Sequence, residues 1–304
     1  MARALTPAPF PGPDPALPRW VRQGLGREDG EAAMFSAGAA LALLDPLART
    51  ADPVDTLWRR RLALAAAAVS RLEGRREGAA QLRDALALCR PGDDPGPAGR
   101  LLTGWRALGE ARALRSTDWP VRLPGFFDLP SEPGAEILRD LGARLTGRSP
   151  PLHFAAEAAR ELLALGPSYR GLALWLADAL LARALGWDRP LPLLAAHLPR
   201  AALRLEGEAW RTACAAGWGR GAVAAFDLHA DLTRRAEALR AAHLRRPGKD
   251  TAATLAALLS EDALAAQAGA QASARAARRL FDRLTARGLV RELTGRPTFR
   301  LYGL

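Results

Sequence analysis

Four arginines recur on one side of a stretch near the end of the chain, Ser273 to Arg287, that is predicted to be a helix. At about 100 degrees per residue, they share the arc opposite an apolar stripe. The arginines are Arg275, Arg278, Arg279 and Arg283, and the stripe is Ala277, Leu280, Phe281 and Leu284. A guanidinium group offers a planar fork of donors that can bind a phosphate or the edge of guanine. The pattern therefore indicates chemistry with a polyanion.

The elements around this helix must position it. Ser273 is a candidate N-cap, and Gly288 stands where a helix ends most easily in a left-handed conformation. Two short helices are predicted before it, over Thr251 to Leu259 and Asp262 to Ala268. Two strands are predicted after it, over Leu289 to Leu293 and Thr298 to Tyr302, with Arg296 at the tip of their hairpin. The expected inner face of that hairpin comprises Leu289, Leu293, Phe299 and Leu301.

Two other interpretations of the arginine face stay open. Charged residues opposite an apolar stripe are also what a solvated helix face contains. The same arrangement of helices and hairpin also serves as a docking module for proteins. Binding of duplex DNA is the interpretation that we favour, through Ser273, Arg275, Arg278, Arg279, Arg283 and Arg296.

Catalytic and metal-binding patterns are weak elsewhere. We find no phosphate-binding glycine loop, zinc-protease motif or nucleophile elbow. The run Asp227, His229 and Asp231 resembles a metal cluster, but neighbours two apart on a helix diverge by about 200 degrees. The pair Asp93 and Asp94 lies in a proline-rich loop, where a turn or helix-capping role is favoured over a ligand. We therefore expect no catalytic residue, metal or cofactor and lean against an enzyme.

The 304 residues are sufficient for two domains, and 49% of them are hydrophobic. The formal net charge of +11 favours a polyanionic partner, although arginine is abundant throughout and Lys249 is the only lysine. Cys89 and Cys214 lack metal-type spacing and suit reduced thiols. We recognise neither a secretory signal nor a membrane span, so a cytoplasmic location with no membrane partner is expected.

The sequence divides into three parts. Residues 1–30 are expected to be a proline-rich extended tail, with Trp20 and Val21 anchoring its end. Residues 31–246 are expected to be an all-helical body. One of its helices should end before Asp45 and Pro46, and another should be broken by glycines 217, 219 and 221. The basic run Arg59 to Arg61 opposes the helix dipole and is best explained as a solvated face, with an ion pair or a ligand as the alternative.

Residues 247–304 form the third part, and their order of helices and hairpin resembles a winged helix-turn-helix domain. The expected fold is thus mainly α: a multi-helix bundle followed by a small winged helix. In several segments, the chain also resembles an uncharacterised bacterial family, domain of unknown function 1403. The segments that carry this resemblance are Ala37–Leu41, Arg60–Leu64, Pro91–Gly99, Leu174–Leu181, Gly186–Trp187, Pro190–Pro192 and Arg278–Leu304. It implies one common architecture and supplies no catalytic residues or cofactor.

We expect a DNA-binding, regulator-like protein whose third C-terminal helix and wing contact double-stranded DNA. The alternative is a protein-interaction or assembly factor that uses the same module for docking. A second copy of the chain or another protein would then be the partner.

Overall fold

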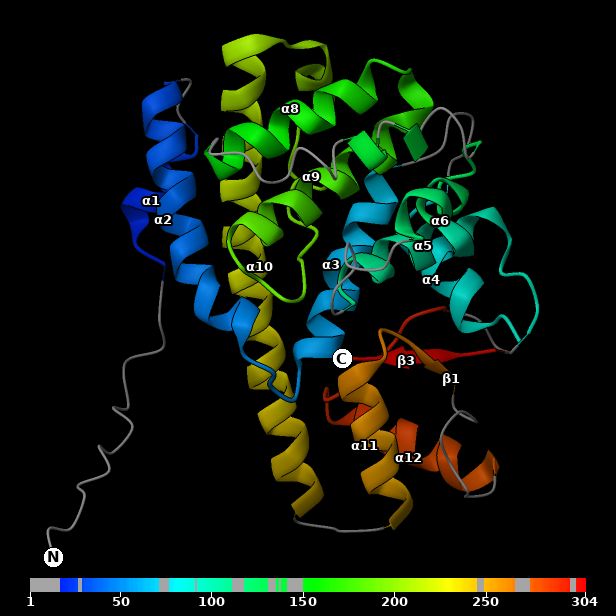
Figure 1. The fold of residues 1–304 in the computed structure, drawn as a ribbon. Helices are drawn as coiled ribbons and strands as arrows, with labels where there is room; N and C mark the ends of the chain where they lie inside the picture. The colour runs from blue at the N-terminus through cyan, green and yellow to red at the C-terminus, as the bar shows by residue number, and fades with distance from the viewer. Residues whose placement is uncertain are drawn as a thin grey trace, which may run out of the picture.

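The computed structural model is mainly helical, with one small sheet near its C-terminal end (Figure 1). It describes residues 17–26, 29–70, 77–90, 92–110, 118–130, 135–136, 138–140, 150–244, 249–265, 274–295 and 299–304. The first helices are α1 (Arg19–Gly24), α2 (Gly30–Arg49), α3 (Asp55–Val69), α4 (Ala79–Ala87), α5 (Gly96–Leu108) and α6 (Trp119–Phe126). They are followed by α8 (Pro151–Leu163), η1 (Pro167–Tyr169), α9 (Arg170–Ala184), η2 (Arg200–Arg204) and α10 (Gly207–Leu244). The C-terminal elements are α11 (Lys249–Ser260), β1 (Leu264–Ala265), α12 (Ala274–Ala286), β2 (Arg291–Glu292) and β3 (Leu301–Gly303).

Helix α9 lies at the centre of the bundle. Every residue from Gly171 to Ala182 is buried, so this helix is enclosed on all sides rather than amphipathic. It packs along α8, and the indole Nε1 of Trp175 donates a 2.8 Å hydrogen bond to the carbonyl of Gly104 on α5. The prediction of a central core helix in this part of the sequence is confirmed.

Helix α10 runs without a break for 38 residues, so the predicted interruption at its glycines is wrong. The glycines serve close packing instead. A Cβ at Gly221 would lie 2.2 Å from the carbonyl oxygen of Leu193, and one at Gly219 would lie 2.2 Å from Leu25. Helix α10 is therefore held between the 190–198 segment and the N-terminal helices because these residues lack side chains.

Helix α2 also continues where the sequence predicted an end, since Asp45 and Pro46 lie inside it. Tertiary contacts hold its last turn: the indole of Trp187 donates to the Asp45 carboxylate at 2.8 Å, and the Arg49 guanidinium donates to the Gly186 carbonyl at 3.0 Å. Among the described residues, α2 is also the one helix whose length and composition would suit a membrane crossing, and one side of it packs on α1 and α10.

The predicted extended tail is wrong for residues 19–24, which form α1. Val21 is fully buried and anchors this helix on the body, as expected, whereas Trp20 is 49% exposed and stacks on Phe35. Residues 1–16 of the predicted tail lie outside the described residues.

The three short strands form one antiparallel sheet in the order β1-β3-β2. Arg291 faces Gly303 and Glu292 faces Tyr302, which confirms that the last two strands pair as a hairpin. A helix over Asp262 to Ala268 is wrong for residues 262–265, because Leu264 and Ala265 pair with β3 instead. Residues 266–268 lie outside the described residues.

Candidate nucleic-acid interface

The inner side of α12 packs against the sheet. Ala277, Phe281 and Leu284 are buried, and the ring of Phe281 stacks on Tyr302 of β3 with centroids 4.4 Å apart. The apolar stripe predicted from the sequence is thus the packed side of the helix. The hairpin prediction needs one correction: Phe299 is 75% exposed rather than inward, while Leu301 is fully buried.

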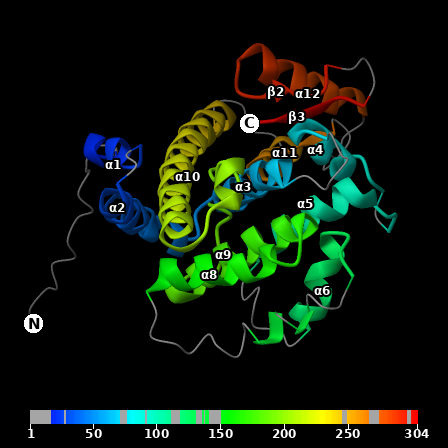
Figure 2. The same ribbon diagram turned by 90° about the horizontal axis from the view of Figure 1, so that it is seen from above.

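The opposite side of α12 carries Arg278, Arg279 and Arg283, and all three are exposed. None of them forms an ion pair or hydrogen bond with a residue that the structure describes. Figure 2 shows α12 at one edge of the molecule, with α6 and α8 at the opposite edge. Of the other predicted site residues, Ser273 and Arg296 lie outside the described residues, as does the side chain of Arg275.

The turn after α12 leads into the hairpin. Gly288 adopts a left-handed conformation with φ of 68°, as the sequence predicted, and its N–H bonds to the carbonyl of Thr285 at 2.9 Å. In the hairpin, the Glu292 carboxylate accepts from the N–H groups of Thr294 and Gly295, each at 2.9 Å. Hydrogen bonding, led by the Thr294 hydroxyl, lowers the pKa of Glu292. This glutamate therefore fixes the start of the turn, a role that sequence reasoning missed.

A buried ion pair joins the start of the C-terminal unit, residues 249–304, to the body. The guanidinium of Arg106 on α5 donates to both carboxylate oxygens of Asp262, at 2.7 and 2.8 Å. Asp262 is only 2% exposed and lies between α11 and β1. The pair links residues 156 positions apart, so no local pattern in the sequence could have identified it.

Further arginines of the body hold the same unit. Arg60 pairs with Glu261, Arg61 donates to the carbonyl of Leu304 at 3.0 Å, and Arg83 donates to the carbonyl of Leu293 at 3.2 Å. Burial lowers the pKa of the Arg60 and Arg61 guanidinium groups. The solvated face expected for Arg59 to Arg61 is therefore wrong: Arg59 and Arg60 form ion pairs, as in the alternative, and Arg61 donates to a backbone carbonyl.

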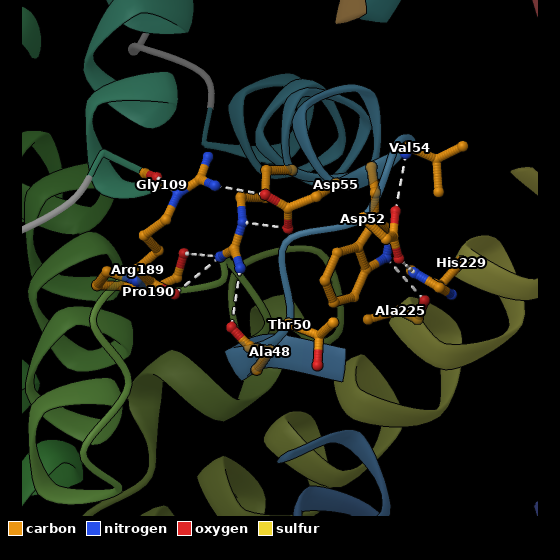
Figure 3. Close-up of polar contacts among 12 residues, drawn as sticks. Ala48, Thr50, Asp52, Val54, Asp55, Gly109, Arg189, Pro190, Ala225 and His229 are labelled. Atoms are coloured by element: carbon orange, nitrogen blue, oxygen red, sulfur yellow. Dashed lines mark hydrogen bonds and ion pairs between the residues drawn. The ribbon is translucent and has the colours of Figure 1, made fainter. Parts of the chain in front are cut away.

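Arg59 belongs to a separate buried network at the start of α3 (Figure 3). Its guanidinium donates to Asp55 at 2.8 Å and to the carbonyls of Ala48 and Arg189 at 3.0 and 2.8 Å. Arg189 in turn donates to the second oxygen of Asp55 and to the carbonyl of Gly109. Because the charged groups already have partners inside the protein, this network is suited to bracing the fold rather than to chemistry with a substrate.

The residues of the Asp227, His229 and Asp231 run point to different partners, as the helical geometry predicted. Asp227 binds Arg22 at 2.7 and 2.8 Å, His229 contacts Asp52, and Asp231 binds Arg235 at 2.7 Å. Among the described residues, no group of three His, Cys, Asp or Glu side chains is placed to hold a metal ion.

The acidic loop before α5 has a local structural role. Asp94 accepts from the N–H of Gly96 at 3.0 Å and binds Arg100 at 2.7 Å, and Arg100 also binds Asp128. Asp94 therefore holds the turn before the helix, in agreement with the turn interpretation, and Arg100 ties the helix to the residues after α6.

The buried carboxylate of Asp178 organises the core beneath these elements. It accepts from the indole of Trp218 at 2.8 Å and from the backbone N–H groups of Leu193 and Leu194 at 3.0 and 3.1 Å. Complete burial raises the pKa of Asp178 to about 8, although these hydrogen bonds act in the opposite direction. The carboxylate joins α9, α10 and the segment between them.

Comparison with known proteins places the chain in a family without assigning an activity. A search of curated proteins finds no match. The family model described as "Protein of unknown function (DUF1403)" matches residues 12–304, which includes both the helical body and the C-terminal unit. The match spans almost the whole chain, and we therefore conclude that this protein belongs to the DUF1403 family.

Proposed function

We propose that the C-terminal unit is a winged helix and that the outward side of α12 binds double-stranded DNA. The order of elements, α11, β1, α12, β2 and β3, supports this reading, as does the sheet order β1-β3-β2. In such a module the helix that precedes the hairpin is the one that enters the major groove. Helix α12 has 13 residues, so it is about 20 Å long and suits a groove about 12 Å wide.

The observation that carries the proposal is the state of Arg278, Arg279 and Arg283. They are exposed on one side of α12 and have no ionic partner among the described residues. Several arginines of the body, among them Arg59 and Arg106, are in contrast engaged in buried ion pairs with Asp55 and Asp262. Exposed guanidinium groups that have no ionic partner among the described residues are available to phosphates, and binding there releases counterions from the duplex.

Fluorescence anisotropy against a labelled duplex at several salt concentrations tests this proposal. The variant Arg278→Ala/Arg279→Ala should bind more weakly, and the slope of log K against log salt should fall by about 0.9 for each lost phosphate contact. The matched control is Arg122→Ala/Arg234→Ala, which removes the same charge from exposed positions on α6 and α10. Equal losses in the two variants would mean that only net charge attracts the duplex.

Docking on another protein is the second candidate, and one observation favours it. Phe299 is 75% exposed and has a φ of 56°, a conformation that is costly for a bulky residue. An exposed aromatic residue held in this way can fill a pocket on a partner. This function predicts no retention on heparin at about 0.15 M salt, the physiological ionic strength. It also predicts a protein complex that Phe299→Ala abolishes.

A further inference from the structure

A groove lies between the last turns of α10, the middle of α11 and the inner edge of α12. The leucines of its lining, here termed the floor, are Leu239, Leu255, Leu280 and Leu284. The hollow measures about 150 Å³ and is open on one side. A cavity of this size with aliphatic walls accommodates a molecule the size of a benzene ring.

The groove also has two arginines in its lining, here termed the rim. Arg283 lies in α12, and Arg287 follows its last residue, Ala286; both line the groove, four residues apart in the chain. His243 of α10 also lines the groove, and its Nδ1 atom is enclosed without a hydrogen-bond partner among the described residues. Among the residues whose side chains the structure describes, no carboxylate contributes to the lining.

We propose that this groove binds a small monocarboxylate with an apolar body, such as an aromatic acid of benzoate size. The ring would occupy the leucine-lined floor, and the carboxylate would accept paired hydrogen bonds from the guanidinium groups at the rim. A neutral ring would leave these donors unused, and an anion without a ring would leave the floor unfilled. The site therefore selects for both features in one molecule.

The position of the groove couples such a ligand to the DNA-binding face. Arg283 belongs both to the rim and to the exposed arginine side of α12. A carboxylate bound in the groove neutralises the charge of Arg283 and occupies a hydrogen-bond donor that would otherwise be available to the duplex. This regulatory consequence rests on the proposed function, whereas binding of the ligand does not.

Binding is tested by ligand-observed NMR titration of the full chain with sodium benzoate. We expect saturation with a Kd on the order of 1 mM or tighter, and at least roughly tenfold weaker binding of benzyl alcohol and of acetate. Arg287→Ala should weaken benzoate binding roughly tenfold, because it removes a charged hydrogen-bond donor at an exposed site. Leu255→Trp should abolish binding by filling the floor.

Arg278→Ala is the matched control, because Arg278 lies on α12 but does not line the groove. Its benzoate affinity should equal that of the unmodified protein. The proposal is overturned if benzoate does not saturate below about 10 mM, ten times the expected Kd. It is also overturned if benzyl alcohol binds as well as benzoate, or if Arg278→Ala and Arg287→Ala lose the same affinity. Should Leu255→Trp not fold, the surface variant Arg287→Ala still decides the matter.

A duplex titration separates the two proposals. Benzoate should weaken duplex binding by the unmodified protein and have a smaller effect on Arg287→Ala. Saturable benzoate binding by a protein with no affinity for any duplex would reject the proposed function and leave the ligand site standing. Duplex binding without saturable benzoate binding would overturn the ligand site alone.

Discussion

Replacing Arg106 by methionine removes the guanidinium that holds Asp262 and should loosen the C-terminal unit. Loss of one partner from a buried ion pair costs about 3–5 kcal/mol. The side chain of Arg106 is 20% exposed, and the charges of Arg60 and Arg61 also act on Asp262. We therefore expect a loss of about 2–3 kcal/mol in the free energy of unfolding.

Urea denaturation followed by circular dichroism measures this loss, and hydrogen exchange locates it. Amides of α11 and α12 should exchange roughly 30-fold faster in Arg106→Met, since 2 kcal/mol corresponds to that factor. Amides of α9, in the centre of the body, should change much less. The double variant Arg106→Met/Asp262→Asn should be less destabilised than the sum of the single variants, with a coupling of about 1 kcal/mol or more.

Arg122→Met is the matched control, because Arg122 forms an exposed pair with Asp118 one turn away. Such pairs contribute about 0.3–0.5 kcal/mol. The reasoning is refuted if Arg106→Met costs no more than this control, or if faster exchange spreads evenly through the body.

Three further predictions concern the packing of the body. Because burial raises the pKa of Asp178, its contribution to stability is present below pH 3.8 and is lost as the pH rises towards 8. Urea denaturation at several pH values measures the stability of the unmodified protein relative to Asp178→Asn. This difference should fall by about 1.4 kcal/mol per pH unit between pH 5 and 7.5. A difference that does not change with pH would show that the Asp178 carboxyl group stays ionised. Gly221→Ala should lower the Tm, at a cost of about 2 kcal/mol or more, because the new methyl group would meet the carbonyl of Leu193 at 2.2 Å. Gly38→Ala on α2 should raise the stability by about 0.5–1 kcal/mol, because nothing lies within 4 Å of the added Cβ, and a lower Tm would contradict this assignment.

Local patterns in the sequence predicted the features that depend on local physics. The apolar stripe of α12 repeats at helical spacing, and Gly288 ends the helix in the conformation that glycine adopts most easily. The pairing of the last two strands followed from two short apolar runs separated by a turn. These features need no knowledge of distant parts of the chain.

Features that depend on distant contacts were missed. Strand β1 exists because Leu264 pairs with Tyr302, and two residues are too few to give a strand pattern of their own. The glycines of α10 resembled a helix break because only the fold shows that Leu193 lies against Gly221. In the same way, Arg60 resembled a solvated residue because its partner, Glu261, is 201 positions away.

Site-specific photo-crosslinking tests the central claim, that the outward side of α12 contacts the duplex. A benzophenone amino acid replaces Ala286, the exposed last residue of α12, three residues after Arg283, and the control replaces Val121, 51% exposed on α6. The account predicts an adduct with an end-labelled duplex from position 286 that disappears as salt is raised, and none from position 121. No adduct from position 286, or equal adducts from both positions, would contradict it.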